Sequence, residues 1–424
     1  MKKYAFLILS VLLFCAACSD DENDVYKTYL VTVQLAYPSG SELSAVEGVP
    51  VKLTGSTGTT YDATTDANGK AAFEKRASNG YSFILNGVKS GITVTETWTG
   101  DSVVEVALTE SKSGQVIIKE LYVGGCQKDD GSGNYQYDKY VILYNNSEQA
   151  ATLENFCLGM VNPYNANSTI NDYKDGVLSY ANDNYIPAGC GIWYLPRNLT
   201  IEAGKQVVIA LNGAINHTLT YSNSVNLSTA DYCTYDIEDF SQTNYYPTPS
   251  ESIPTSNYFT AYKYGQGTAW VLSNQSPAFF IFSTHDVTPE VFASNTDYHY
   301  TADKEGNAVY RCTKVPTDWM EVFSQAQLAK SQKRLTPAID AGYTVLTNAQ
   351  GYTSYRNVDK QATEAVEENS GKLVYSYNYG TDGSTDPSGI DAEASLKNGA
   401  RIIYQDTNNS TNDFHQRKQA SLRD

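Results

Sequence analysis

The sequence predicts an all-β protein with two tandem β-sandwich domains, and three observations support this prediction. Apolar residues alternate with polar ones in short runs such as Val31, Val33 and Leu35, the pattern of a half-buried strand. Residues 65–73 contain the pair Asn68-Gly69, which is typical of a tight turn between two strands. The 424 residues include 34 tyrosines but only 3 methionines, a bias toward residues that favour strands.

The N-terminus has the features of an export signal. Lys2 and Lys3 precede an apolar run over residues 4–14, and the small residues Ala16 and Ala17 stand before Cys18. This ending resembles a bacterial lipobox, with Cys15 where leucine is usual. The resemblance implies cleavage after residue 17 and acylation of Cys18, because several acyl chains anchor a protein stably. The alternative is an ordinary signal peptide that leaves Cys18 as a free thiol.

Residues 18–28 form an acidic tether that begins Ser-Asp-Asp-Glu after Cys18. Acidic residues at this place resemble the surface-export signal of Bacteroidota lipoproteins, which implies an outer-membrane protein facing the extracellular side. A solvated spacer is the alternative. Loss of Lys2 and Lys3 with the signal would take the net charge from −17 to −19. Nucleic acid is therefore excluded as a partner, because its phosphates require clustered Lys and Arg.

Residues 29–110 are predicted to form a small β-sandwich of about seven short strands. The segments 47–51 (EGVPV) and 65–73 (TDANGKAAF) resemble the carboxypeptidase-regulatory-like, prealbumin-type fold. Domains of that type are spacers or adhesive modules, so the resemblance implies a stalk without an active site.

Residues 116–424 are predicted to form a second, larger β domain after a polar linker. The strand-like segments 116–122, 139–147, 151–159 and 201–210 resemble a lamin-tail domain, an immunoglobulin-like sandwich. As a whole, this region resembles an uncharacterised family of Bacteroidota surface lipoproteins, a domain of unknown function, and this match is carried by residues 352–360 and 406–417.

Long Tyr- and Asn-rich insertions are expected to interrupt the second domain at residues 162–188 and 214–267. One helix is predicted over residues 318–333, where Trp319, Met320, Phe323 and Leu328 suggest an apolar stripe. Residues 358–370 are expected to form either a short helix or a loop.

No catalytic motif stands out, and we predict that the protein is not an enzyme. The sequence lacks His-Glu-x-x-His, Gly-x-Ser-x-Gly and phosphate-binding glycine motifs. His285 and Asp286 are neighbours, but if the preceding strand continued through them their side chains would point to opposite faces. A structural histidine is the preferred interpretation.

No cofactor is predicted, and structural calcium is the alternative considered. Two loops are rich in oxygen ligands, one with Asp129 and Asp130 and the other with Asp382 and Asp386. Ordinary turn chemistry, in which Asp side chains bond nearby backbone N–H groups, is the preferred explanation. An odd number of cysteines follows Cys18, so the sequence fixes no disulfide pattern.

One segment stands out as a candidate ligand or partner surface. Tyrosine offers rigid amphipathic contact area that could stack on a sugar, a peptide, a flat cofactor or a partner barrel. The alternative is that these rings pack a long insertion onto the sheet. The candidate residues are Tyr232, Tyr235, Tyr245, Tyr246, Tyr258, Tyr262 and Tyr264.

These observations favour a non-catalytic accessory that binds an extracellular nutrient or an outer-membrane uptake partner, such as a TonB-dependent transporter. A structural or adhesive surface protein and, third, a hydrolase are the alternatives.

Overall fold

The computed structural model describes residues 5–7, 28–36, 47–48, 50–55, 60–76, 81–84, 101–107, 109–111, 115–170, 172–181, 185–264, 267–301, 308–313, 318–337 and 339–423. Cys18 and the start of the acidic tether lie outside these residues. The chain divides into two compact units. The first is Met1–Ser113 with Thr407–Asn409, and the second is Gly114–Asp406 with Ser410–Asp424.

The first unit contains two three-stranded sheets and a short strand pair. Alternate residues Val31, Val33 and Leu35 are buried, as their spacing predicted. The predicted turn is also present, because Gly69 N donates to Asp66 O at 2.9 Å. The sheet strands are β5 (Lys70–Arg76), β2 (Thr28–Ala36) and β7 (Ser102–Ala107) in one, β4 (Thr60–Thr64), β3 (Pro50–Gly55) and β6 (Tyr81–Ile84) in the other, and the pair is β1 (Ala5–Leu7) with β8 (Thr109–Ser111).

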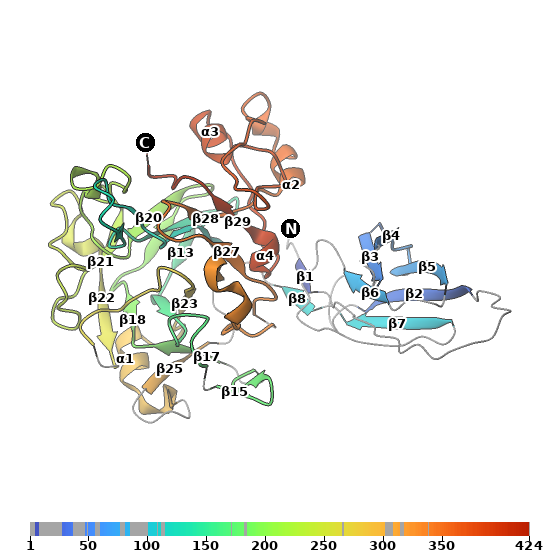
Figure 1. Ribbon diagram of the computed structural model, residues 1–424, viewed down its shortest axis with the longest axis horizontal. Coiled ribbons are helices and arrows are strands. Elements are labelled where there is room, and N and C mark those ends of the chain that lie inside the picture. The colour runs from blue at the N-terminus through green and yellow to red at the C-terminus, as the bar shows by residue number, and fades with distance from the viewer. Residues whose placement is uncertain are drawn as a thin grey trace. The chain divides into compact units, whose positions relative to one another are not determined.

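The second unit is built on one twelve-stranded sheet (Figure 1). Most neighbouring strands are antiparallel, although β20–β21, β21–β22 and β26–β27 are parallel. In spatial order the strands are β27 (Thr344–Leu346), β26 (Asp318–Ser324), β23 (Ala278–Ser283), β14 (Phe156–Met160), β18 (Gly191–Tyr194), β22 (Tyr258–Lys263), β21 (Tyr232–Thr234), β20 (Gln206–Ala210), β12 (Tyr140–Asn145), β9 (Val116–Tyr122), β28 (Thr353–Arg356) and β29 (Phe414–Arg417).

The two ends of this sheet approach each other, so that it is nearly closed like a barrel. β27 contacts β29, and β26 contacts β9. Side chains make the connection where no backbone ladder does: Ile118 N donates to Asp318 Oδ2 at 2.5 Å, and Thr347 N donates to the Gln416 carboxamide. We call this junction the seam.

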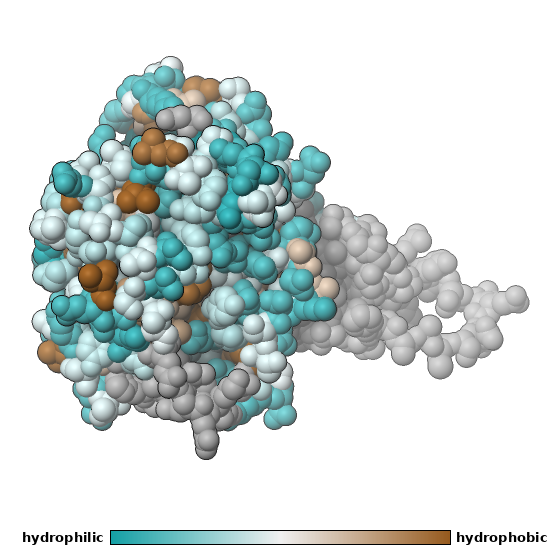
Figure 2. Space-filling view, turned by 60° about the vertical axis from the view of Figure 1, so that its left-hand side comes forward, coloured by the Kyte–Doolittle hydropathy of each residue, from teal (hydrophilic) through white to brown (hydrophobic). Residues whose placement is uncertain are grey.

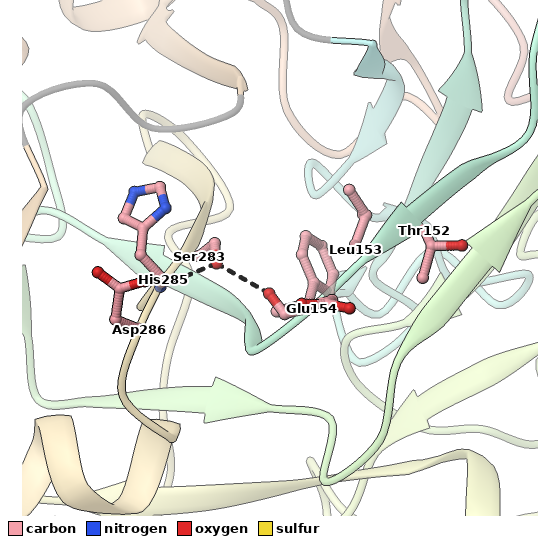
Figure 3. Close-up of a pocket in the computed structure, with 7 residues that line it drawn as sticks. Thr152, Leu153, Glu154, Ser283, His285 and Asp286 are labelled. Atoms are coloured by element: carbon pink, nitrogen blue, oxygen red, sulfur yellow. Dashed lines mark hydrogen bonds between the residues drawn. The ribbon is translucent and has the colours of Figure 1, made fainter.

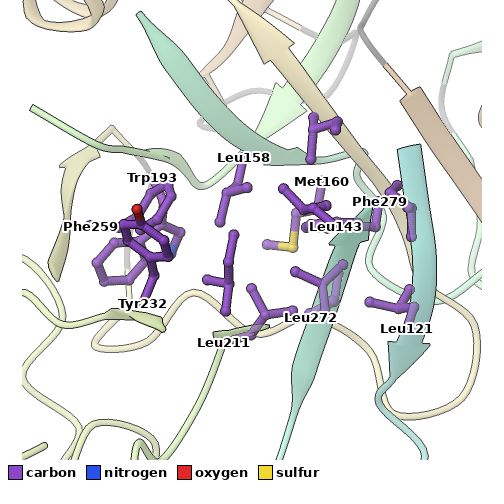
Figure 4. Close-up of a cluster of buried hydrophobic side chains, with 14 of the residues drawn as sticks. Leu121, Leu143, Leu158, Met160, Trp193, Leu211, Tyr232, Phe259, Leu272 and Phe279 are labelled. Atoms are coloured by element: carbon purple, nitrogen blue, oxygen red, sulfur yellow. The ribbon is translucent and has the colours of Figure 1, made fainter. Parts of the chain in front are cut away.

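Several strands of this sheet are covered on both faces. β9, β12 and β14 are buried along their whole length. In β12, Val141 and Leu143 face the main core (Figure 4), whereas Ile142 lies in a separate cluster under the insertions. The protein is therefore mostly β with little helix, as the predicted class required, but the second unit has one continuous barrel-like sheet where a two-sheet sandwich was expected.

Short helices, 3₁₀ turns and small strand groups lie outside the large sheet. Asp359 and Asp391 cap helices by accepting backbone N–H groups of Ala362 and Ala394. The small strand groups are β10 (Cys126–Gln127) with β11 (Asn134–Tyr135), β13 (Ala151–Leu153) with β19 (Leu199–Ile201), β15 (Tyr173–Lys174) with β16 (Val177–Leu178), and β17 (Tyr185–Gly189) with β25 (Ala308–Thr313) and β24 (His299–Thr301). The helices are α1 (Pro289–Ser294), α2 (Lys360–Glu364), α3 (Ala392–Lys397) and α4 (Ser410–Asp413), with 3₁₀ turns η1 (His217–Leu219), η2 (Thr255–Asn257), η3 (Thr296–Tyr298), η4 (Gln325–Lys330) and η5 (Glu367–Asn369).

In the part of the chain that the structure describes, none of the helices has the length and apolar character needed to cross a membrane.

The helix predicted over residues 318–333 is wrong. Residues 318–324 form strand β26, and a 3₁₀ turn follows. β26 is buried on both faces, because Met320 and Val322 enter the main core while Trp319 enters a neighbouring cluster. A strand buried on both faces has no polar side, so its apolar content imitated a helical stripe. Residues 358–370 do contain short helical turns, α2 and η5.

Candidate functional site

Four half-buried tyrosines from three separate segments meet ring to ring on the second unit. We call them the tyrosine chain, which runs Tyr221, Tyr135, Tyr137, Tyr245. Successive ring centroids lie 4.6, 5.6 and 4.8 Å apart. The last two contacts are edge to face, at 75° and 87°, a geometry that the ring quadrupoles favour. The rings therefore hold one another in place while each remains partly open to solvent.

A buried histidine, His217, holds the tyrosine chain in place through a hydrogen bond to Tyr135. The Tyr135 hydroxyl lies 2.7 Å from His217 Nδ1, and His217 Nε2 lies 2.6 Å from the Gly213 carbonyl oxygen. A carbonyl only accepts, so Nε2 carries the proton and Nδ1 accepts from Tyr135. Burial lowers the pKa of His217 to about 4, and the ring is neutral at pH 7.

Gly213 is required at this place. Its φ is +60°, and a Cβ there would lie 2.4 Å from His217 Cε1 and 2.6 Å from the Tyr137 carbonyl oxygen. Any larger residue would displace the histidine that holds Tyr135.

Polar groups lie along the tyrosine chain. The Asn274 side-chain amide donates to Gln136 Oε1 at 2.5 Å. The buried Lys139 ammonium lies 5.8 Å from the Tyr245 ring centroid and donates to Leu272 O at 2.5 Å. Tyr164, 50 % exposed, is close enough to contribute to the raised pKa of Tyr245, after burial and Tyr137.

The predicted tyrosines do not form one surface. Tyr232 and Tyr246 are buried in the main core, where Tyr232 lies near Trp193 and Phe259 (Figure 4). The others are half-buried and pack in different places. Tyr235 and Tyr258 pair at 5.6 Å, Tyr262 and Tyr264 pack against the cluster that contains Trp319, and Tyr245 joins the tyrosine chain.

Three of the four chain members were missed from the sequence. Tyr135 and Tyr137 are two residues apart, the spacing that places side chains on one side of an extended segment, so a signal was available. Tyr221 had no such signal, because only the folded insertion brings it within 4.6 Å of Tyr135.

A second location is a surface cavity of about 400 Å³ around His285 (Figure 3). β23 ends at Ser283 and His285 has φ +55°, so the strand does not continue. His285 and Asp286 therefore both line the cavity, together with Glu154, and the opposite-face argument does not apply. Ser283 Oγ donates to Glu154 O at 2.8 Å and accepts from His285 N at 3.0 Å, which ties the two turns together.

The first loop considered for calcium uses its carboxylates in backbone hydrogen bonds. Both Asp129 oxygens accept from Ser222 N, at 3.0 and 2.9 Å. Asp130 Oδ1 accepts from Ser132 N at 2.9 Å, an Asx turn.

The second calcium candidate is organised in the same way. Asp386 accepts from Val358 N at 2.9 Å and Ser388 N at 2.8 Å, while Asp382 is exposed in a neighbouring turn. Within the described residues, no three His, Cys, Asp or Glu side chains gather in a way that could hold a metal ion.

Cys126, Cys190 and Cys233, in the described part of the chain, are free thiols. Burial raises the pKa of Cys126 and Cys233 to about 12, so both remain protonated at neutral pH.

The architecture defines a class of protein: mostly β, with a large, nearly closed barrel-like sheet and little helix. The chain belongs to the family described as "Protein of unknown function (DUF4876)", whose model matches residues 202–421. No curated protein matches the sequence.

Comparison with two solved structures gives one match with a TM-score above 0.5. The crystal structure of a DUF4876 family protein from Bacteroides thetaiotaomicron VPI-5482 matches with a TM-score of 0.52 at 18% identity, covering 91% of this chain and 94% of that chain. A DUF3823 family protein from Parabacteroides merdae ATCC 43184 matches with a TM-score of only 0.16 at 13% identity, covering 42% of this chain and 81% of that chain. At these identities the first likeness concerns the fold alone.

Proposed function

We propose that this protein is a lipid-anchored, non-catalytic binding accessory on the outer surface of a bacterial outer membrane. The observation that carries the binding role is the tyrosine chain, which presents partly exposed rings in a fixed arrangement. The anchor rests on the lipobox-like sequence that ends at Cys18, and the outward location on the acidic residues after it.

The mechanism is capture by a preformed surface. The rings contact one another and Tyr135 is fixed by His217, so little side-chain entropy is lost when a ligand binds. Figure 2 shows hydrophobic residues as separate spots on the face drawn, without an extended apolar patch there. An acyl anchor would keep the captured ligand at a high effective concentration near an uptake system.

We also propose roles for the first unit and for an outer-membrane partner. Residues 29–110 would act as a carboxypeptidase-regulatory-like spacer, and the second unit would derive from a lamin-tail-like core. A TonB-dependent transporter is the proposed partner that takes up the ligand.

Affinity capture tests the binding role. The full-length protein is retrieved from detergent-solubilised outer membranes, and co-purifying molecules are identified by mass spectrometry. We expect a ligand or partner to be retained by wild type and lost from the double variant Tyr137→Ala/Tyr221→Ala. The matched control is Tyr375→Ala, which removes a 57 % exposed ring bonded to Glu364, elsewhere in the second unit.

Retention of the same molecules by the double variant would refute the tyrosine chain as the binding surface. Capture of nothing by wild type would favour the structural or adhesive alternative. The hydrolase alternative would act at the His285 cavity, where Glu154 and Asp286 stand. It predicts cleavage of a glycan or peptide that Glu154→Gln abolishes.

A further inference from the structure

We infer that the ligand of the tyrosine chain is a neutral oligosaccharide. This inference rests on the proposed function and assigns the chemical class of the ligand.

The rings suit the apolar faces of sugars. A pyranose presents C–H groups on its faces and hydroxyls at its edges, and the electron-rich face of a phenol attracts C–H groups. The tyrosine chain offers a succession of rings at 4.6 to 5.6 Å. Successive ring planes are turned by 43°, 75° and 87°, so several rings in different orientations suit a chain of sugar units, whereas one flat ligand would use a single ring.

The charges around the rings argue for a neutral ligand. The Lys128 ammonium lies 5.9 Å from the Tyr221 ring, and Asp129 next to it bonds Ser222 N, so opposite charges flank that end. At the other end, the positive charge of Lys139 beside Tyr245 is likewise balanced by a neighbour of opposite charge, the buried Asp138. In a protein with a net charge of −17, this balance leaves neither an anion-binding nor a strongly cation-binding surface.

The hydrogen-bonding groups at the site fit hydroxyls. A phenol hydroxyl, such as those of Tyr137 and Tyr221, can both donate to and accept from a sugar hydroxyl. The Tyr164 phenol lies near Tyr245. An extended peptide would instead be bound chiefly through main-chain hydrogen bonds at a sheet edge.

Titration calorimetry on the full chain tests the inference. The probes are neutral linear hexasaccharides of α- and β-linked glucose, mannose, galactose and xylose, with an oligogalacturonate and an unstructured neutral peptide for comparison. At least one neutral sugar is expected to bind. The substitution Tyr137→Ala is expected to weaken the affinity for that sugar about tenfold or more. Tyr137→Phe, which keeps the ring, should retain most of the affinity, and Tyr375→Ala should leave it unchanged.

Failure of every neutral sugar to bind a folded wild-type protein overturns the inference, as does preferential binding of the uronate or the peptide. Unchanged affinity in both Tyr137→Ala and Tyr221→Ala overturns it too. If affinity capture is still lost from the double variant in those cases, the binding role stands and only the ligand class is wrong. If capture never depends on the two rings, the proposed function itself fails.

Discussion

At the scale of single residues, the protein uses buried polar side chains to fix its surface. His217 is 2 % exposed and joins Tyr135 to the Gly213 carbonyl, so one neutral imidazole sets the position of a ring on the outside. The same side chain makes stability depend on pH, because protonation would break its bond from Tyr135.

We predict that His217 contributes to acid sensitivity. Its pKa is about 4 when folded and about 6.5 when unfolded, so between these values the unfolded chain binds the extra proton. The contribution of the neutral His217 to the stability of the folded protein is complete above pH 6.5 and is lost as the pH falls toward 4. Urea unfolding gives the free energy of unfolding of each protein. The difference between wild type and His217→Gln should fall by about 2 kcal/mol, to the disadvantage of wild type, from pH 7.5 to pH 4.5.

Comparison with His217→Gln cancels other groups that titrate in the same range. Burial raises the pKa of Asp138 to about 6, which acts in the opposite direction in both proteins. A difference between the two proteins that is constant with pH would show that His217 is not buried as a neutral ring.

At the scale of elements, the seam explains how a strongly curved sheet nearly closes. Arg356 on β28 bonds Asp318 on β26, and Arg356 Nε donates to Ile118 O at 2.6 Å on β9. These strands lie near opposite ends of the sheet order, so a buried ion pair connects them where the backbone ladder is interrupted. A second buried pair, Arg334 with Glu321 at 3.1 Å, fixes the segment after β26.

We predict that Arg356→Ala lowers the free energy of unfolding by about 3–5 kcal/mol, because Asp318 would stay buried without its partner. Chemical denaturation measures this. The paired variant Arg356→Met/Asp318→Leu should recover only part of this loss, because Asp406 and Asp413, which lie 3.4 and 4.0 Å from Arg356 Nη1, keep their charges. Arg197→Ala, at an exposed arginine, serves as the control and should change stability by less than about 1 kcal/mol. Equal losses in the single and paired variants would contradict the role of the ion pair.

The elements also show what the sequence could predict. Alternation identified β2, and Asn68-Gly69 identified a turn, because these signals are local. β26 was mistaken for a helix because burial on both faces removed its alternation. The tyrosine chain was found only at Tyr245, since its other members come from segments that meet through tertiary structure alone.

At the scale of the whole molecule, the proposal joins an anchor to a binding surface. The Cys18 prediction lies outside the described residues and depends on the sequence. We expect Cys18→Ser to release the protein from the membrane pellet into the soluble fraction, because the acyl chains would be lost. Cell fractionation with immunoblotting measures this, and a variant that stays with the membrane would contradict lipid anchoring. Wild type should also be cleaved by protease added to intact cells, and resistance there would argue against surface display.

The most direct test of the central claim is photo-crosslinking on living cells. A benzophenone amino acid replaces Tyr221 in the tyrosine chain or, as the control, Tyr375. We expect light to produce adducts from Tyr221 and not from Tyr375. No adduct at Tyr221, or equal adducts at both positions, would contradict the claim that the tyrosine chain is where this protein binds.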